Sequence, residues 1–285
     1  MPRRLGQHFL RDQKALRKIV AALEITPHDT IVEVGPGHGE LTQHILNAKP
    51  KKIIAIERDP QLANFLKENF QFTILSSQSS TKSRLPKRGI VEGDALKVLP
   101  DFIWKLKNEN WKLVGNIPYY ITGHLLRKIS ELEKKPKLVV LTIQKEVAER
   151  IAAEPLRRRQ GSGGQGNMNL LAASVQFWGE PKILGYISKK SFRPPPKVDS
   201  AIIKISPNSK QPSQKEAERY YQFIKILFKQ PRKTILNNLR EGLTLPQKEI
   251  EKRLQKLNIS PGLRPANLSM PDINKLTLIF RDKKV

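Results

Sequence analysis

The chain has 285 residues, 38% of them hydrophobic, and carries 52 Lys and Arg against 26 Asp and Glu, for a formal net charge of +26. This length suggests one large domain and a smaller one. The charge favours a polyanionic partner, and nucleic acid is preferred over a membrane because no strongly amphipathic basic helix stands out. Cys is absent, which excludes disulfides, thiolate zinc sites and cysteine nucleophiles.

Two further classes, membrane-spanning and secreted proteins, are disfavoured by particular segments of the sequence. The longest apolar stretches, such as residues 138–143, are too short to span a bilayer, and the first residues lack the apolar core of a secretory signal. We therefore expect a cytoplasmic protein. The five His residues show no metal-ligand spacing, so we expect no metal.

The first half of the chain alternates predicted strands and helices. Residues 12–24 have helical spacing, and residues 30–39 form a buried strand that runs into a glycine-rich turn before a helix over 40–48. A second strand, 52–56, ends at Glu57, which follows Gly35 at close to the ~20-residue spacing expected of an acid that binds ribose hydroxyls. This order predicts an α/β fold with a Rossmann-like first unit.

Three more strands follow a helix over residues 60–70. The third strand, residues 89–92, leads to Asp94, and the fourth, residues 111–114, is ended by Gly115 and followed by Asn116. The fifth strand spans residues 137–143, with a helix over 144–153. Two polar segments, 76–88 and 154–167, are expected to be surface insertions.

The segment after the fourth strand suggests chemistry on an aromatic amine. Asn116, Ile117, Pro118 and Tyr119 form a stiff turn at a strand's carboxyl end, where open α/β sheets bind ligands. The Asn116 side-chain oxygen and a backbone carbonyl fixed by Pro118 can accept both N–H bonds of an exocyclic amine, while Tyr119 stacks on its ring. An isolated Asn-x-Pro-Tyr is more often an ordinary turn, so the neighbouring signals decide its meaning.

The glycine turn is weak evidence by itself. It lacks the third glycine of the dinucleotide pattern, because Thr42 stands three residues after Gly39. S-adenosylmethionine, which has no pyrophosphate to cradle, fits better. Taken together, Gly35, Glu57, Asp94 and Asn116 at successive strand ends match the methionine moiety, ribose, adenine and methyl acceptor in turn.

The last third of the chain changes character. A helix over 168–178 and strands over 182–187 and 198–205 complete the first unit, and the basic, proline-rich loop 189–197 is expected to present Phe192 rather than bury it. Helical spacing then dominates, with predicted helices at 220–229, 234–240 and 248–257. We place the boundary near residue 206, giving a Rossmann-like domain over 1–205 and a basic, helical RNA-binding domain over 206–285.

These motifs resemble one family as a set. The chain is similar to the ribosomal RNA adenine dimethyltransferases, and within them to the KsgA (RsmA) branch, in GQHFL at 6–10, EVGPGHGELT at 33–42, IERD at 56–59, GDAL at 93–96, NIPYYI at 116–121 and FRPPPKVDS at 192–200. The likeness covers about residues 5–285. It implies a Rossmann-like methyltransferase domain with a small C-terminal helical domain.

The resemblance also implies the activity and the site. Methyl groups would pass from S-adenosylmethionine to N6 of two adjacent adenosines in the 3′-terminal hairpin of small-subunit (16S) rRNA, during maturation of that subunit. The residues implied to bind the cofactor are His8, Leu10, Gly35, Glu57, Asp94 and Asn116. The implied catalytic residues are Asn116, Pro118, Tyr119 and Phe192, with the two rings around the target base.

Two alternatives stay open. An Erm-type enzyme would methylate large-subunit rRNA, although the motif at 192–200 favours the small-subunit branch. A non-catalytic RNA-binding assembly factor could keep the same scaffold, although it would be expected to lose Glu57, Asp94 or Asn116 first, and all three are present. A monomer whose partner is small-subunit rRNA or the immature subunit is the expected state.

Overall fold

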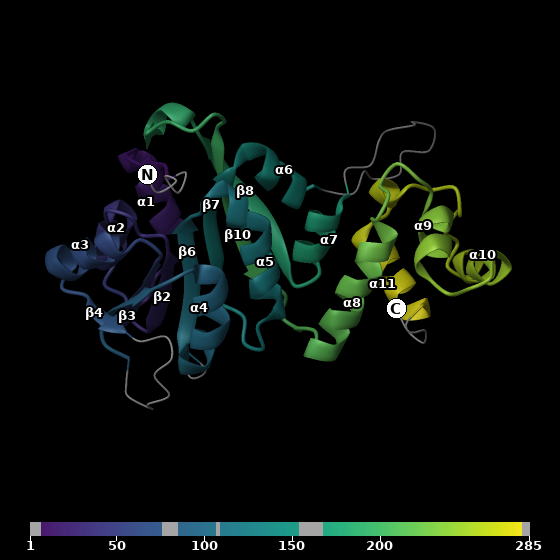
Figure 1. Cartoon of the computed structure of the whole chain (residues 1–285), viewed down its shortest axis with the longest axis horizontal. Coiled ribbons are helices and arrows are strands. Elements are labelled where there is room, and N and C mark those ends of the chain that lie inside the picture. Colours follow the sequence, from purple (N-terminus) through teal and green to yellow (C-terminus); the bar gives the residue numbers. More distant parts are fainter. Residues whose placement is uncertain (1–6, 76–84, 107–108, 154–167, 281–285) are drawn as a thin grey trace. The chain divides into compact units, whose positions relative to one another are not determined.

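The computed structural model describes residues 7–75, 85–106, 109–153 and 168–280 (Figure 1). The chain divides into two compact units, one made of Met1–Ala148 and Glu180–Pro207 and the other of Glu149–Gly179 and Asn208–Val285. The second unit thus begins near the expected boundary at 206 and also takes in residues 149–179. Most of the expected insertion at 76–88 and all of that at 154–167 lie outside the described residues.

The first unit is built on an eight-stranded sheet in the order β4-β5-β3-β2-β6-β7-β10-β8. Neighbours from β4 to β7 run parallel, and β10 is antiparallel to β7. Parallel strands joined by helices confirm the expected Rossmann-like α/β class. In sheet order the strands are Thr73–Leu75, Arg88–Glu92, Lys52–Glu57, Asp29–Val34, Asn110–Asn116, Val139–Gln144, Ser200–Pro207 and Gly179–Ile187.

A second sheet has only two strands, β1 (Phe9–Leu10) and β9 (Phe192–Arg193), paired antiparallel. It joins the N-terminal segment to a loop more than 180 residues away, with Leu10 opposite Phe192. Neither strand was predicted, because two-residue strands show no periodicity. The edge strand β4 was also missed, because its three residues are too few to show periodicity.

Helices cover both faces of the large sheet (Figure 1). On one face, apolar residues of α1, α2 and α3 pack against alternate side chains of the strands, including Ile31, Ile53 and Val114. Helices α4 and α5 contact one another, and α4 also contacts β3. These helices and the short α6 span Gln13–Ala22 (α1), Glu40–Asn47 (α2), Pro60–Phe70 (α3), Ala95–Phe102 (α4), Thr122–Glu131 (α5) and Lys145–Ile151 (α6).

Local capping explains where several of these helices begin. The Asp12 carboxylate accepts hydrogen bonds from the N–H groups of Lys14 and Ala15, as an N-cap should. Asp59 caps α3 in the same way, and Pro60 occupies its first turn. The predicted starts of α1 and α3 are confirmed.

The second unit is helical. Its helices are Leu170–Gln176 (α7), Gln214–Leu227 (α8), Ile235–Gly242 (α9), Gln247–Lys256 (α10) and Met270–Ile279 (α11). The rings of Phe177 and Tyr220 stack 3.7 Å apart, and the Tyr220 hydroxyl donates to the carbonyl of Ala173. This contact packs α7 against α8 and explains why residues 149–179 belong to the second unit.

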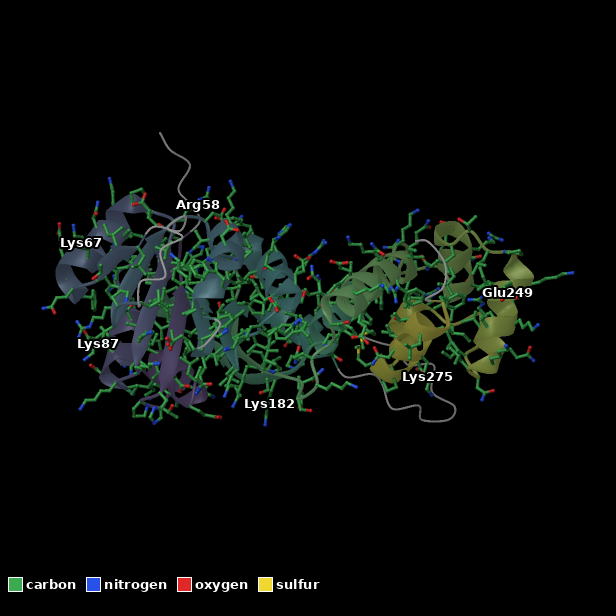
Figure 2. The ribbon with its side chains drawn as sticks, turned by 90° about the horizontal axis from the view of Figure 1, so that it is seen from below. Arg58, Lys67, Lys87, Lys182, Glu249 and Lys275 are labelled. Atoms are coloured by element: carbon green, nitrogen blue, oxygen red, sulfur yellow. The ribbon has the colours of Figure 1, made fainter. Side chains whose placement is uncertain are left out.

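Basic side chains extend outward from both units (Figure 2). Lys67, Lys87 and Lys182 of the first unit and Lys275 of the second are all exposed. Within the described residues, no helix combines the length and apolar character needed to cross a membrane.

Candidate active site

The four parallel strands β5, β3, β2 and β6 are direct neighbours, so their carboxyl ends meet at one edge of the sheet. Asp94 follows β5, Glu57 ends β3, Gly35 follows β2 and Asn116 ends β6. The expected alignment of these residues along one edge is confirmed.

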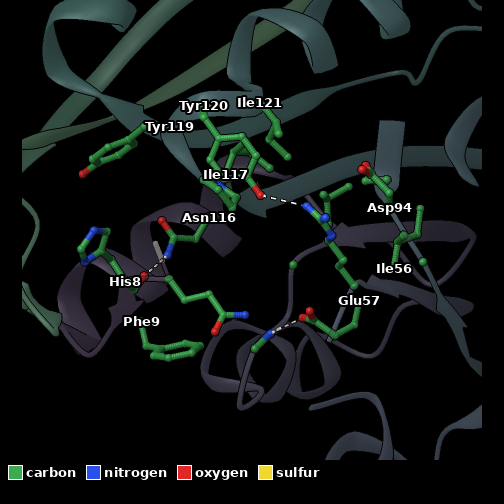
Figure 3. Close-up of a pocket in the computed structure, with 18 of the residues that line it drawn as sticks. His8, Phe9, Ile56, Glu57, Asp94, Asn116, Ile117, Tyr119, Tyr120 and Ile121 are labelled. Atoms are coloured by element: carbon green, nitrogen blue, oxygen red, sulfur yellow. Dashed lines mark hydrogen bonds between the residues drawn. The ribbon is translucent and has the colours of Figure 1, made fainter. Parts of the chain in front are cut away.

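A cavity opens at this edge (Figure 3). Its lining includes eight of the residues expected from the sequence, namely His8, Gly35, Glu57, Asp94, Asn116, Pro118, Tyr119 and Phe192. Residues from six separate segments of the chain therefore share one site.

The floor of the cavity is formed by the glycine turn and Glu57. Gly35 and Gly37 have φ of +67° and +60°, a conformation that side chains disfavour, and a Cβ on Gly37 would lie 2.8 Å from the ring of Phe9. The N–H of Gly37 donates to Glu57 Oε2 at 3.1 Å, and the N–H of Asp59 donates to Oε1 at 2.9 Å. Glu57 is thus held in one orientation beside the turn.

Electrostatics around Glu57 combine two opposing effects. Burial raises the pKa of its carboxyl group, and the hydrogen bonds from the N–H groups of Asp59 and Gly37 oppose that rise. Each carboxylate oxygen has a further lone pair available to accept from a hydroxyl group. Asp94 caps α4 by accepting from the N–H of Leu96 through Oδ1.

Asn116 is oriented by the N-terminal segment. Its Nδ2 donates to the backbone carbonyl of His8 at 2.7 Å, which leaves Oδ1 as the acceptor (Figure 3). The His8 ring is in turn held by a 2.8 Å hydrogen bond between Nδ1 and the carbonyl of Pro194. Since that carbonyl can only accept, Nδ1 carries the proton.

Tyr119 follows Asn116 closely in the chain, in the 3-10 helix η2 (Tyr119–Ile121). Its ring centroid lies 6.0 Å from that of His8, and its hydroxyl lies 3.1 Å from Ser200 Oγ. Burial is the largest cause raising the pKa of the phenol, so it stays protonated at neutral pH.

Two expectations differ from the structure. Phe192 is not presented by its loop: it is 2% exposed and belongs to the core, because the pairing of β9 with β1 places Leu10 beside it. It borders the cavity from this buried position. Leu10 also lies in the core, and it lines a smaller neighbouring cavity together with Gly35 and Asn116.

The cavity also contains residues that the sequence did not single out. Phe9 packs edge-on against His38 at 4.5 Å between ring centroids, and Arg58 Nη1 donates to the hydroxyl of Tyr120 at 3.3 Å. Both Phe9 and Arg58 lie inside motifs quoted above. Their positions next to His8 and Glu57 in the sequence could have indicated that they line the cavity. Tyr120 is 56% exposed.

A family model described as "Ribosomal RNA adenine dimethylase" matches residues 2–282. The chain belongs to this family. A ribosomal RNA small subunit methyltransferase A of Dehalococcoides mccartyi is 36% identical over 98% of this chain and 88% of its own length. A protein of the same name from Mycoplasmopsis pulmonis is 36% identical over 98% of both chains.

Solved structures agree with the family. A dimethyladenosine transferase from Plasmodium falciparum superposes with a TM-score of 0.73 at 26% identity, covering 96% of this chain and 98% of that one. The 23S rRNA methyltransferase ErmE gives a TM-score of 0.67 at 24% identity over 96% of this chain and all of that one, which supports the fold alone. As a member of the dimethylase family, the protein is an rRNA adenine methyltransferase that uses S-adenosylmethionine.

The residues present fit that methyl donor. The glycine turn leaves space that a side chain would fill, and Glu57 offers oxygens suited to paired ribose hydroxyls. The carboxylates of Glu57 and Asp94 would repel a 2′-phosphate, so a dinucleotide phosphate cofactor fits poorly.

Proposed function

We propose that the protein transfers methyl groups to N6 of two adjacent adenosines in the 3′-terminal hairpin of small-subunit rRNA, during assembly of that subunit in the cytoplasm. The observation that carries this proposal is the geometry of Asn116 at the cavity, within a chain of this family. The names of the relatives, matched over nearly the whole chain, support the small subunit as the target.

Binding of the donor is assigned to one half of the cavity. We assign the ribose to Glu57, the adenine to Asp94 and the methionine moiety to Gly35 and the backbone near His8. S-adenosylmethionine supplies an electrophilic sulfonium methyl group. The order of these residues along the sheet edge supports a position for that group next to Asn116.

The amine is held by two acceptors. Asn116 Oδ1 accepts one N–H of the target amine, and a backbone carbonyl of the turn accepts the other. The carbonyl of Pro118 already accepts from the N–H of Ile121 at 3.1 Å, so the Ile117 carbonyl, fixed by the peptide bond to Pro118, is the better candidate. Both bonds draw the nitrogen lone pair out of conjugation and direct it toward the methyl group.

The reaction then needs no dedicated base. As the N–CH₃ bond forms, the S–CH₃ bond breaks and sulfur keeps its electron pair. The alkylated nitrogen is strongly acidic and loses its proton to water. Tyr119 and Phe192 hold the target base after it has left its stack.

Substitution of Asn116 tests this assignment. We expect Asn116→Ala to abolish methyl transfer, measured as radioactive methyl incorporated into small-subunit rRNA, while RNA affinity changes little because phosphate contacts dominate it. Equal loss of RNA affinity and turnover would contradict the role given to Asn116.

The Erm-type alternative left open by the sequence makes large-subunit rRNA the second candidate substrate. Offering each subunit's RNA separately, followed by primer extension across the small-subunit 3′ hairpin, distinguishes the two. Calorimetry with S-adenosylmethionine measures binding of the donor directly, which a non-catalytic assembly factor would lack. We take a monomer as the active form, and gel filtration tests it.

A further inference from the structure

We propose that Asp199 and Ser200 are positioning residues that hold the two aromatic walls of the target-base slot, Tyr119 and Phe192, at a fixed separation. This inference rests on the proposed function, which assigns those two rings to the target base. It adds two residues that touch neither cofactor nor base and act through their hydrogen bonds to the walls.

Ser200 fixes the ring of Tyr119 at its far end. Its Oγ lies 3.1 Å from the Tyr119 hydroxyl, and Ser200 itself is fully buried. The backbone of Ser200 is paired with Gln144 in the register between β10 and β7, so the serine is fixed by the large sheet. A ring held both at Cβ and at its hydroxyl cannot swing about its side-chain torsions.

Asp199 fixes the segment that carries Phe192. Its Oδ1 accepts from the N–H of Lys189 at 2.9 Å, at the first residue of the 3-10 helix η3 (Lys189–Ser191). Phe192 follows η3 directly. The backbone carbonyl of Asp199 accepts from the N–H of Lys145 at 3.0 Å, which ties it to the end of β7.

The two residues are neighbours in the chain, since Asp199 directly precedes Ser200, the first residue of β10. The Asp199 side chain holds the η3 segment, and the Ser200 side chain holds Tyr119. Both aromatic rings are thereby anchored to the same rigid element, the start of β10. A slot of constant width keeps the target amine in line for attack, where an error of ~1 Å can cost about 100-fold in rate.

The first experiment is a double-mutant cycle on Ser200 and Tyr119. Ser200→Ala and Tyr119→Phe each remove one side of the same hydrogen bond while keeping the buried methylene or the ring. We expect each to lower the single-turnover rate about 5- to 10-fold, with the affinities for rRNA and for S-adenosylmethionine unchanged. The double variant should lose no more than either single one, because the interaction can be removed only once.

Asp199 is tested by a pair of variants. Asp199→Asn keeps an oxygen that accepts from the Lys189 N–H, and Asp199→Ala removes it. We expect the Asn variant to keep nearly the full rate and the Ala variant to lose about tenfold. Equal losses in both would mean that the charge is what matters, and would overturn the positioning role.

Controls separate this inference from folding and from the proposed function. If Ser200→Ala lowers the melting temperature but leaves the rate intact, Ser200 is a structural residue only and the inference is wrong. Tyr119→Ala removes the wall itself. Loss of activity in Tyr119→Ala with normal activity in Ser200→Ala overturns the inference alone, whereas normal activity in Tyr119→Ala overturns the wall assignment and the inference with it.

Discussion

Asn116 Nδ2 donates a 2.7 Å hydrogen bond to the backbone carbonyl of His8, across 108 positions of sequence. The bond determines which way the carboxamide faces, since the nitrogen turns to His8 and the oxygen remains to accept from an amine. The N-terminal segment is itself held by the pairing of β1 with β9. Orientation of the Asn116 amide therefore depends on residues from both ends of the first unit.

This relationship predicts the effect of Asn116→Asp. A carboxylate keeps the acceptor but cannot donate to His8, and its second oxygen would face the His8 carbonyl. We expect turnover to fall by about 100-fold or more, as when a single transition-state hydrogen bond is removed. Single-turnover methylation measures it, and full activity would show that the bond to His8 does not orient the amide.

Glu57→Gln tests the assignment of the ribose. The amide has one acceptor oxygen where the carboxylate has two, so it cannot accept from the Gly37 and Asp59 N–H groups and from two hydroxyls as well. We expect affinity for S-adenosylmethionine, measured by calorimetry, to fall about 10- to 100-fold. Because burial raises the pKa of Glu57, wild-type affinity should also weaken as pH falls toward that pKa, and the Gln variant should lose this dependence.

The sequence predicted those residues of the site that lie at the ends of regular strands. Gly35, Glu57, Asp94 and Asn116 each end or follow a strand of clear hydrophobic pattern, and parallel strands in one sheet must bring their ends together. Helical spacing also predicted helices that begin close to the observed starts of α1 and α3. These conclusions needed only periodicity and the rules of sheet topology.

The burial of Phe192 could not be predicted in that way. It depends on pairing between two-residue strands far apart in sequence, and a strand of two residues has no pattern. The same pairing moves Leu10 into the core. The role inferred for Ser200 likewise depends on the register of β10 against β7 and on a side-chain contact to η2, which sequence spacing does not encode.

The net charge of +26 predicts a steep dependence of RNA binding on salt. If roughly six phosphates are contacted, the logarithm of the binding constant should fall by about 4 to 5 for each tenfold rise in salt. Filter binding over a salt series measures the slope. A slope near zero would show that the basic residues do not face the RNA.

Glu33 should make stability fall as pH rises. It is fully buried in β2 and accepts from the Thr42 hydroxyl at 2.7 Å, and burial raises its pKa to about 8. The folded state therefore holds a proton that the unfolded chain releases near pH 4.5, so this contribution to stability is complete below pH 4.5 and declines up to about pH 8. In Glu33→Gln, whose amide resembles the protonated acid, the melting temperature should fall less between pH 6 and about 9 than in wild type.

Glu109 should have the opposite dependence. It lies at the amino ends of β2 and β3, where it accepts from Lys52, Lys51 and the Thr30 hydroxyl. Burial alone would raise its pKa, but these hydrogen bonds prevail and lower it to about 2. A lowered pKa gives stability that is complete above the unfolded value of 4.5 and is lost as pH falls toward 2.

We therefore expect Glu109→Gln to lower the free energy of unfolding at pH 7 by about 2 to 3 kcal/mol, because Lys52 is left buried without its partner. The difference between the variant and wild type should shrink as pH falls below 4.5, which urea titrations at pH 7 and 3 would show. Lys128, whose ion pair with Glu131 is exposed, supplies the matched control: Lys128→Gln should change stability by less than about 0.5 kcal/mol. A constant Glu109 effect at both pH values would mean that shape, and not charge, explains the loss.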